Sequence, residues 1–287
     1  MTRPDTPTVL VTGANSGIGS ATIDALLDRD ARVVATVRSQ SSATKLLADH
    51  GGGRGGVRGD GGGEGQLLVE LLDVTDAERA AAVIERHRPD VVINNAGAAL
   101  LGALADIDDD DALAQLEAMV IGPVRLARLA SRFQSERGHG RIVNVSSTLA
   151  STAMPFTGWY GAAKAALDSV TDTLRLELGP SGIAVVRVEC GAVKTGAWDD
   201  AGDTVEQGDD ESTAKSRKRW ADLTTLVQPL FEDPDEVAKV IAEAALARRP
   251  RPVYRVGFAS RLGILSNLVP TRLEDLVTRT VFSLKAP

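Results

Sequence analysis

Short apolar runs alternate with amphipathic stretches along most of this 287-residue chain. The runs are rich in valine, isoleucine and leucine, which is typical of buried strands; the stretches repeat apolar side chains every three or four positions, which is typical of helices. Strands are predicted at residues 8–11, 32–37, 67–74, 91–95, 142–145, 184–189 and 253–256. Helices are predicted at residues 18–27, 76–88, 112–132 and 234–248, and from residue 159 onward. This alternation predicts an α/β fold, a single domain over residues 1–287 whose doubly wound, seven-stranded parallel sheet is covered by helices on both faces.

Three segments depart from this pattern. Residues 51–65 include ten glycines and cannot bury enough apolar surface to offset the entropy lost on ordering, so we expect a flexible surface loop. Residues 199–211 carry seven acidic side chains and residues 215–219 four basic ones, which predicts a mobile flap and not packed core. The tail, residues 258–287, has an amphipathic helix whose apolar stripe suits covering the pocket entrance, pairing subunits or touching a membrane surface. We expect this stripe to cover the protein's own pocket or core; it consists of Leu273, Leu276, Val277, Val281 and Leu284.

Composition narrows the possible function classes. The net charge of −7 argues against nucleic acid as a partner. Cys190 is the only cysteine, which excludes an intrachain disulfide and favours a reducing compartment. The first residues lack the apolar core of a signal peptide, and no apolar run approaches the roughly 18 residues of a membrane span, so we expect a cytoplasmic protein. The three histidines have no ligand spacing, so no metal site is predicted.

A glycine-rich turn links the first predicted strand to the first predicted helix. Gly13, Gly17 and Gly19 follow the spacing G-x-x-x-G-x-G, which differs from the G-x-G-x-x-G dinucleotide fingerprint. Backbone N–H groups point outward at a helix N-terminus and the helix dipole favours anions, so this place predicts a site for the pyrophosphate of a dinucleotide. The spacing alone would also fit an ordinary turn, but its position between strand and helix favours the cofactor site.

The end of the second predicted strand indicates which dinucleotide binds. An NAD-binding unit usually has an acidic residue there, which accepts a hydrogen bond from the ribose 2′-hydroxyl. Here Val37 occupies the position and Arg38 follows it. A guanidinium suits a 2′-phosphate, and a solvated surface arginine is the alternative interpretation. We therefore favour NADP(H) over NAD(H).

Residues 141–164 contain the candidate chemistry. Tyr160 and Lys164 lie four apart on one helical face, and Ser147 ends the preceding strand, so the loop between them can bring the serine hydroxyl beside the phenol. An ammonium one turn away favours the phenolate and would bring Tyr160 toward a useful range for acid–base catalysis. A Tyr–Lys pair at this spacing is common on exposed helices. The serine and the glycine turn favour an alcohol-to-ketone interconversion.

Taken together, these motifs resemble those of the short-chain dehydrogenase/reductase family over nearly the whole chain. They are Thr12-Gly13-Ala14-Asn15-Ser16-Gly17-Ile18-Gly19, Asp73-Val74, Asn94-Asn95-Ala96-Gly97, Ser147, Tyr160-x-x-x-Lys164 and Cys190-Gly191-x-Val193-x-Thr195. The resemblance implies a Rossmann-type domain with Ser147, Tyr160 and Lys164 as catalytic residues.

The resemblance also implies cofactor contacts along one edge of the sheet. Asp73 and Val74 would contact the adenine, and Val193 and Thr195 the nicotinamide carboxamide. Residues 95–97 would lie close to the adenosine half or steady the central sheet. The predicted cofactor-binding residues are Gly13, Asn15, Ser16, Gly17, Ile18, Gly19, Arg38, Asp73, Val74, Asn95, Ala96, Gly97, Tyr160, Lys164, Val193 and Thr195.

Two residues depart from the family pattern. Met119 stands where the resemblance places an Asn that distorts its helix and holds a water passing protons to the lysine. A thioether accepts only weakly and donates nothing, so either the relay is rebuilt by another group, or turnover is lowered. Alternatively, Met119 fills apolar space beneath the site. Cys190 replaces a usual Pro, and we expect a buried small residue there and not a nucleophile.

The resemblance implies an NADP(H)-dependent oxidoreductase that interconverts a ketone and a secondary alcohol. Tyr160 would protonate the oxygen, Ser147 would orient it, and Lys164 would lower the tyrosine pKa and hold the nicotinamide ribose. The tail resembles that of hydroxysteroid and retinol dehydrogenase-like members, which implies a bulky, hydrophobic substrate such as a steroid, polyketide or retinoid-like molecule. Residues 196–232 sit where the family places its substrate lid, and family members are commonly homodimers or homotetramers.

Other interpretations stay open. Met119 and the charged flap also fit an NADP(H)-binding regulatory protein with weakened catalysis, and the same scaffold could serve a dehydratase or epimerase. Phe156, Trp159 and Trp198 lie close to the catalytic motifs in sequence and either line an apolar substrate pocket or belong to the core.

Overall fold

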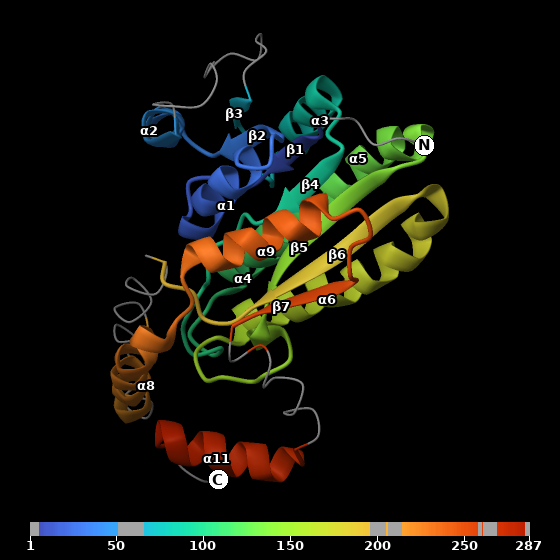
Figure 1. Cartoon of the computed structure of the whole chain (residues 1–287). Helices are drawn as coiled ribbons and strands as arrows, with labels where there is room; N and C mark the ends of the chain where they lie inside the picture. The colour runs from blue at the N-terminus through green and yellow to red at the C-terminus, as the bar shows by residue number, and fades with distance from the viewer. Residues whose placement is uncertain are drawn as a thin grey trace.

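The computed structural model describes residues 6–50, 66–195, 205, 214–257, 260 and 269–284; the predicted glycine-rich loop, residues 51–65, lies outside them. Seven strands form one parallel sheet in the order β3-β2-β1-β4-β5-β6-β7 (Figure 1). The strands are β1 (Thr8–Val11), β2 (Arg32–Val37), β3 (Leu67–Leu71), β4 (Val91–Asn94), β5 (Gly140–Ser147), β6 (Ile183–Cys190) and β7 (Val253–Val256). The predicted seven-stranded parallel sheet is confirmed.

Helices cover both faces of this sheet, as predicted. They are α1 (Gly17–Leu27), α2 (Gln40–His50), α3 (Ala77–His87), α4 (Asp109–Leu116), α5 (Gly122–Arg137), α6 (Gly158–Leu178), α8 (Ala214–Val227), α9 (Pro234–Leu246) and α11 (Thr271–Phe282). Helices α1, α2 and α9 pack on one face, and α3, α5 and α6 on the other.

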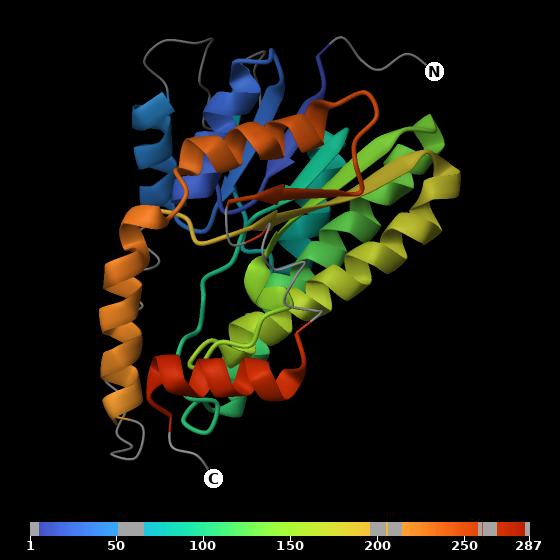
Figure 2. The same cartoon turned by 60° about the horizontal axis from the view of Figure 1, so that its bottom comes forward.

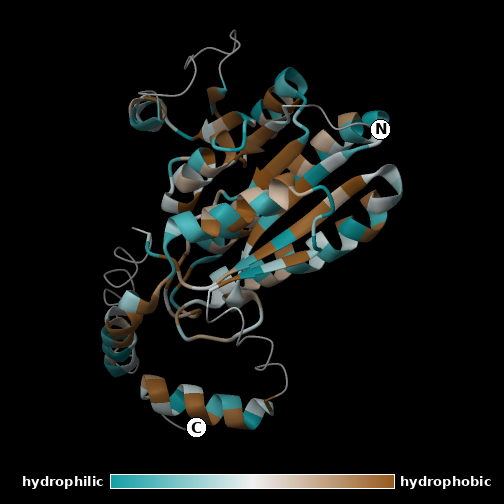
Figure 3. Cartoon of the chain, viewed as in Figure 1, coloured by the Kyte–Doolittle hydropathy of each residue, from teal (hydrophilic) through white to brown (hydrophobic). Residues whose placement is uncertain are grey.

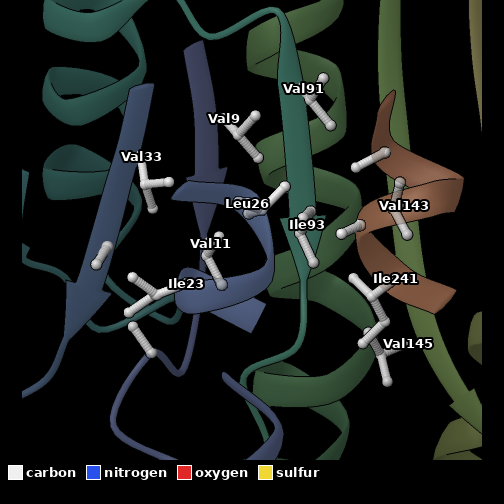
Figure 4. Close-up of a cluster of buried hydrophobic side chains, with 14 of the residues drawn as sticks. Val9, Val11, Ile23, Leu26, Val33, Val91, Ile93, Val143, Val145 and Ile241 are labelled. Atoms are coloured by element: carbon white, nitrogen blue, oxygen red, sulfur yellow. The ribbon is translucent and has the colours of Figure 1, made fainter. Parts of the chain in front are cut away.

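Alternation along the strands builds two apolar layers. Val9 and Val11 of β1 face α1 and α9, whereas Leu10 between them belongs to the opposite layer. In the first layer, Ile23 of α1 and Ile241 of α9 meet side chains of β1, β2, β4 and β5 (Figure 4). Each fully buried aliphatic side chain contributes about 1.5–3 kcal/mol relative to an exposed one. These layers fix the strand ends, where the candidate site lies.

The sheet grows in opposite directions from β1 and β4, so the loops after these two strands diverge at the carboxyl edge. The Thr12 hydroxyl joins them: it accepts the backbone N–H groups of Asn95 and Ala96, both at 3.0 Å, and contacts the Ile93 carbonyl at 3.3 Å. The Asn95 amide donates to the carbonyls of Thr12 at 3.0 Å and Gly13 at 3.1 Å. The glycine turn is thereby fixed to the end of β4.

Two elements differ from the predicted ones. Helix α2 is absent from the prediction because most of its side chains are polar, and only Ala43 and Leu46 are buried. Strand β3 ends at Leu71 and not at residue 74. The reason is a turn in which Oδ1 of Asp73 accepts the backbone N–H and the hydroxyl of Thr75, at 3.0 and 2.7 Å.

A π-helical turn interrupts the long helix predicted over residues 112–132. Helix α4 begins at Asp109, after Asp108, whose carboxylate accepts the backbone N–H of Asp111 at 2.9 Å and so caps the helix. The π-turn η1 (Glu117–Ile121) contains Met119, and α5 follows it. The helix is therefore distorted at this position although a methionine cannot make the polar contacts of an asparagine.

Part of the predicted flap is packed. Residues 214–227 form α8, where Trp220 is fully buried against Leu101 and Phe156, so the prediction of a mobile, unpacked segment is wrong here. One large aromatic side chain outweighs the charged neighbours that suggested a solvated segment. Residues 196–204 and 206–213 lie outside the described ranges.

Helix α11 lies beside α8 (Figure 2). Arg219 of α8 donates from Nε to the Val281 carbonyl at 3.2 Å, and Phe282 packs against the cluster around Trp220. Apolar and polar residues alternate along α11 (Figure 3). Most of its apolar stripe is exposed and does not cover the core, contrary to the prediction, because Phe282 and the backbone attach the helix instead. Its exposed side chains are Leu273, Leu276, Val277 and Val281.

Candidate active site

The three predicted catalytic side chains converge where β5 ends and α6 begins. Ser147 hydrogen-bonds the Tyr160 hydroxyl and also accepts the backbone N–H of Leu149, at 3.2 Å. Lys164, one helical turn beyond Tyr160, is only 6 % exposed and donates from Nζ to the Val145 carbonyl at 2.7 Å. All three line one cavity of about 720 Å³.

Burial dominates the protonation of this site. It raises the pKa of Tyr160 to about 12, although the hydrogen bond with Ser147 acts in the opposite direction. It lowers the pKa of Lys164 to about 8. The expected lowering of the tyrosine pKa by the lysine is therefore not observed: Nζ lies 5.7 Å from the ring centroid and donates to the Val145 backbone instead. The four-residue spacing of Tyr160 and Lys164 predicts that they lie on the same helical face. It does not predict that both side chains are removed from water.

The glycine turn requires glycine at two of its positions. Gly13 has a φ of 65°, and a Cβ on it would lie 2.8 Å from Cα of Ala96. A Cβ on Gly19 would collide with the Gly13 carbonyl. Ser16 caps α1 by accepting the backbone N–H of Gly19 at 3.0 Å. The first turn of α1, including Gly17, lines the cavity, where its N–H groups suit an anion.

A second cavity, of about 400 Å³, adjoins the glycine turn on the side of β2. Arg38 is exposed at its rim and makes no hydrogen bond or ion pair within the part of the chain that the structure describes. Asp73 also lines it, and the backbone hydrogen bond from Thr75 holds the pKa of this carboxyl below its usual value. This cavity thus combines an exposed guanidinium with a carboxylate that is engaged in a turn and whose pKa the Arg38 charge also lowers.

The segment after β6 completes the larger cavity. Val193 pairs with Glu232, whose carbonyl accepts the backbone N–H of Lys194 at 2.8 Å. Thr195 lies against the glycine turn, since a Cβ on Gly17 would approach its Cγ2 to 2.9 Å. Cys190 is buried, and burial raises its pKa to about 12, so it remains a thiol near neutral pH, as expected of an unreactive residue.

Met119 lines the larger cavity and is 2 % exposed. It packs against Ala163 of α6, which agrees with the apolar-filler interpretation. The amide of Gln115 lies 2.8 Å from the Met119 sulfur; it also donates to the Ala98 carbonyl at 2.6 Å and accepts from the Leu100 N–H at 2.8 Å. Gln115, which the sequence pattern does not single out, thus ties the distorted helix to the loop after β4.

Of the two alternatives for Phe156 and Trp159, the described residues do not support pocket lining. Phe156 is buried in the cluster around Trp220, and Trp159 contributes to neither wall. Trp198 lies outside the described residues. Aliphatic and thioether side chains, including Leu101 and Met154, line the larger cavity instead.

The sequence pattern gives no role to two further residues near the site. Thr12 lies within the glycine motif. Its hydroxyl links the glycine turn to the segment after β4, a contact that the sequence does not reveal because the two segments are distant along the chain. Asp168 follows Lys164 by four positions, the same spacing that singles out Tyr160 and Lys164. Its Oδ2 lies 3.1 Å from Nη1 of Arg187.

Nearly all the predicted site residues line one of the two cavities; Gly19, beneath the turn, lines neither. Those in the larger cavity are Asn15, Ser16, Gly17, Ile18, Asn95, Gly97, Ser147, Tyr160, Lys164, Val193 and Thr195. Those in the smaller one are Gly13, Asn15, Ser16, Arg38, Asp73, Val74, Asn95, Ala96 and Gly97. Within the described ranges, no three metal-ligating side chains cluster, and no helix is both long and apolar enough to cross a membrane.

The chain matches a known family and named relatives. Residues 7–206 match the family model of the short chain dehydrogenases, so the chain belongs to this family of oxidoreductases. It is similar to estradiol 17-beta-dehydrogenase 1 of Rattus norvegicus, with 31 % identity over 284 residues, covering 94 % of this chain and 78 % of the relative. It is 29 % identical over 277 residues to 17-beta-hydroxysteroid dehydrogenase type 1 of Homo sapiens, covering 93 % of this chain and 81 % of that protein.

Solved structures share the fold. A short-chain dehydrogenase from Streptomyces avermitilis matches with a TM-score of 0.76 and 26 % identity, covering 98 % of both chains. A short chain dehydrogenase from Burkholderia cenocepacia J2315, solved in complex with NADP, matches with a TM-score of 0.71 over 95 % of this chain and 97 % of that one. At 23 % identity, the second likeness concerns the fold alone.

Proposed function

We propose that this chain is an NADP(H)-dependent oxidoreductase that interconverts a ketone and a secondary alcohol on a bulky, hydrophobic substrate. The main support is the convergence of Ser147, Tyr160 and Lys164 in the cavity that the glycine turn also lines. A hydroxyl donor, a second hydroxyl beside it and an ammonium suit proton transfer to a carbonyl oxygen. We also propose a homo-oligomer, which the family resemblance implies, and a cytoplasmic location, which the single cysteine favours.

The residues of both cavities fit a nicotinamide dinucleotide. The backbone at Gly13 leaves no room for a side chain, and the first turn of α1 offers N–H groups to a pyrophosphate. Arg38 would hold a 2′-phosphate because its exposed guanidinium lines the smaller cavity, which supports NADP(H) over NAD(H). Lys164 would hold the nicotinamide ribose. When bound, the cofactor supplies the hydride.

The protonation states favour Tyr160 as the acid. With a pKa of about 12 its hydroxyl is protonated near neutral pH and can donate to the carbonyl oxygen during reduction. Ser147 hydrogen-bonds the same hydroxyl and would orient the substrate oxygen. Lys164, with a pKa of about 8, is mostly cationic near neutral pH, so its charge would stabilise the phenolate that forms when the proton leaves.

The larger cavity supports a bulky, apolar substrate. Its volume of about 720 Å³ would be shared between the nicotinamide end of the cofactor and the substrate. Leu101, Met119 and Met154 give it apolar walls. The relatives named for 17-beta-hydroxysteroids support steroid ketones as the first substrates to test.

Replacing Tyr160 by Phe tests this function. Tyr160→Phe should bind NADPH with wild-type affinity, measured by fluorescence, yet lose about 100-fold or more of ketone reduction, because the proton donor is gone. Tyr254→Phe is the matched control: the Tyr254 hydroxyl accepts the Arg251 N–H at 3.3 Å, away from both cavities, and removing this hydroxyl should leave turnover unchanged. The assay follows NADPH oxidation with steroid, aromatic polyketide and retinoid-like ketones. Retained turnover in Tyr160→Phe would remove the tyrosine from its proposed role.

The second candidate function is an NADP(H)-binding regulatory protein. Met119 favours it, because a buried thioether lines the cavity where a polar residue would relay protons. The same assay distinguishes the two functions: a regulator binds NADPH but does not consume it with any ketone of the panel. A dehydratase or epimerase would convert substrate without net oxidation of the cofactor.

A further inference from the structure

Helix α6 carries a third ionisable residue on the face of Tyr160 and Lys164. Asp168 lies one turn beyond Lys164, and residues at i, i+4 and i+8 share one side of a helix. Its side chain is only 16 % exposed, although unpaired aspartates are usually solvated. Oδ2 lies 3.1 Å from Nη1 of Arg187, and the carboxylate faces the Ser146 hydroxyl of β5. The position therefore places a half-buried carboxylate one helical turn beyond Lys164.

Asp168 is the anion that acts on Lys164. The groups facing the ammonium in the described structure are Tyr160, Cys190 and Asp168. Burial raises the pKa of both Tyr160 and Cys190 to about 12, so these two are neutral near neutral pH. Burial lowers the pKa of Lys164 to about 8, and Cys190 and then Asp168 oppose that change. Because the Cys190 thiol is neutral near neutral pH, Asp168 is the group of the two that carries a negative charge there. The lysine would lose its charge at lower pH without this carboxylate.

The surroundings of Asp168 leave its charge incompletely neutralised. Arg187 of β6 also lies 3.7 Å from Oδ2 of Asp172, so two carboxylates share one guanidinium. Glu189, also on β6, adds a second negative charge; Nε of Arg255 on β7 lies 3.3 Å from it. Burial, followed by Glu189, raises the pKa of Asp168, while Ser146, Arg187 and Lys164 act in the opposite direction. A nearby ammonium stabilises the charged form of such a carboxylate.

We propose that Asp168 is a positioning residue that keeps Lys164 cationic beside Tyr160. This inference rests on the proposed function, since it matters to catalysis only if the lysine charge assists the tyrosine. Asp168 touches neither substrate nor cofactor in this role. It acts through the ammonium, which its charge holds in the protonated form that donates to the Val145 carbonyl.

The test is a direct titration of Lys164 in the full chain. Lysine labelled with ¹³C at Cε reports protonation by its NMR shift, and Lys164→Arg assigns the signal. In Asp168→Asn the pKa of Lys164 should fall by about 1 unit because an opposite charge is lost. Asp172→Asn is the matched control: it removes the same charge from the same helix and the same arginine, one turn farther away. It should shift the lysine pKa by less than about 0.3 units.

Asp168→Glu and the wild type keep the test valid if Asp168→Asn does not fold. Asp168→Glu retains the charge and should leave the lysine pKa near its wild-type value. In the wild type, the Lys164 signal should show a second, small inflection in acid, at the pH where Asp168 titrates. Equal shifts in Asp168→Asn and Asp172→Asn, or a Lys164 signal with no acid inflection, would overturn the proposal.

Turnover separates this inference from the proposed function. A drop of about 1 unit from a pKa near 8 lowers the cationic fraction of Lys164 about fivefold at pH 8 but less than twofold at pH 6. Asp168→Asn should therefore lose about fivefold in kcat at pH 8 and little at pH 6, whereas a structural defect would lower both. If the lysine pKa shifts but the wild type consumes no ketone, the proposed function fails and the role of Asp168 as counterion stands. The reverse result refutes only the inference about Asp168.

Discussion

A buried and a half-buried carboxylate beside the sheet have opposite surroundings. Glu70, on the edge strand β3, faces Nη2 of Arg79 at 2.8 Å, Nη1 of Arg86 at 2.9 Å and Nε2 of His87 at 2.8 Å. Burial alone would raise its pKa, but the hydrogen bonds from His87 and Arg86 outweigh burial and hold the pKa below its usual value. Asp168, on α6, shares one arginine with another carboxylate, and burial raises its pKa.

The difference separates a group used by the fold from one available to the site. The Glu70 carboxylate has three polar partners on α3, so its charge is neutralised locally and joins β3 to α3. Asp168 has fewer, and its charge extends to Lys164. Burial is common to both carboxylates; the number of partners decides the direction of the pKa shift.

The largest expected effect is on the kcat of a variant of Lys164 in α6. Lys164→Met should lower the kcat of ketone reduction about 100-fold or more, because the charge beside Tyr160 is lost while the side-chain volume is kept. Lys239→Met, on the exposed face of α9, is the control and should leave kcat unchanged. Steady-state kinetics with saturating NADPH measures both. Unchanged turnover in Lys164→Met would contradict the claim that the charge on the α6 side serves catalysis.

The same variant should change the pH dependence of stability. The pKa of Lys164 is about 8 in the folded chain, against a usual value of 10.5, so the unfolded state binds more protons between these pH values. The wild type therefore gains stability from this group as pH rises from about 8 to 10.5, and the gain is lost as pH falls through 8. Urea unfolding of Lys164→Met across this window should lack that gain.

The next effect is on the side of β3. Glu70→Gln should lower the free energy of unfolding by about 3 kcal/mol, because two arginines and a histidine lose their buried partner. The pKa of Glu70 is depressed, so its contribution is present above the usual value of 4.5 and is lost as pH falls through the lower folded value. Glu85→Gln, which removes an exposed pair with Arg88, should cost less than about 1 kcal/mol. Urea titrations at pH 7 and below compare the two variants. Equal losses in the free energy of unfolding would contradict a stabilising role of Glu70 between β3 and α3.

The smallest expected effect concerns Arg38, the exposed arginine at the rim of the smaller cavity. Arg38→Leu should weaken NADPH binding about tenfold and leave NADH binding unchanged, because only NADPH carries the 2′-phosphate. Arg128→Leu, an exposed change on α5, is the control for altered net charge. Fluorescence titrations with both cofactors measure the ratio. Equal losses for NADPH and NADH in Arg38→Leu would contradict the predicted preference.

The sequence allows the sheet and the location of the site to be predicted, because both depend on local patterns. Apolar runs such as 142–145 are strands whatever surrounds them, and the four-residue spacing of Tyr160 and Lys164 fixes their common helical face. The glycine turn is equally local, since it links one strand directly to one helix.

The remaining features depend on contacts between distant segments. Trp220 is buried by Leu101 and Phe156, more than sixty residues away, which no local pattern of charge could reveal. The pKa directions of Tyr160 and Lys164 follow from desolvation by neighbouring elements, and spacing alone suggests the opposite direction for the tyrosine. Such quantities become predictable only once the layers are assembled.

The single cysteine has a practical consequence for spectroscopic work. Because Cys190 is buried and its thiolate is scarce at neutral pH, maleimide reagents should leave it unmodified in the native enzyme. A cysteine introduced on the exposed side of α11, at Leu276 for example, would then accept a fluorophore selectively. The native chain thus provides a nearly silent background for following that helix by fluorescence while ligands are added.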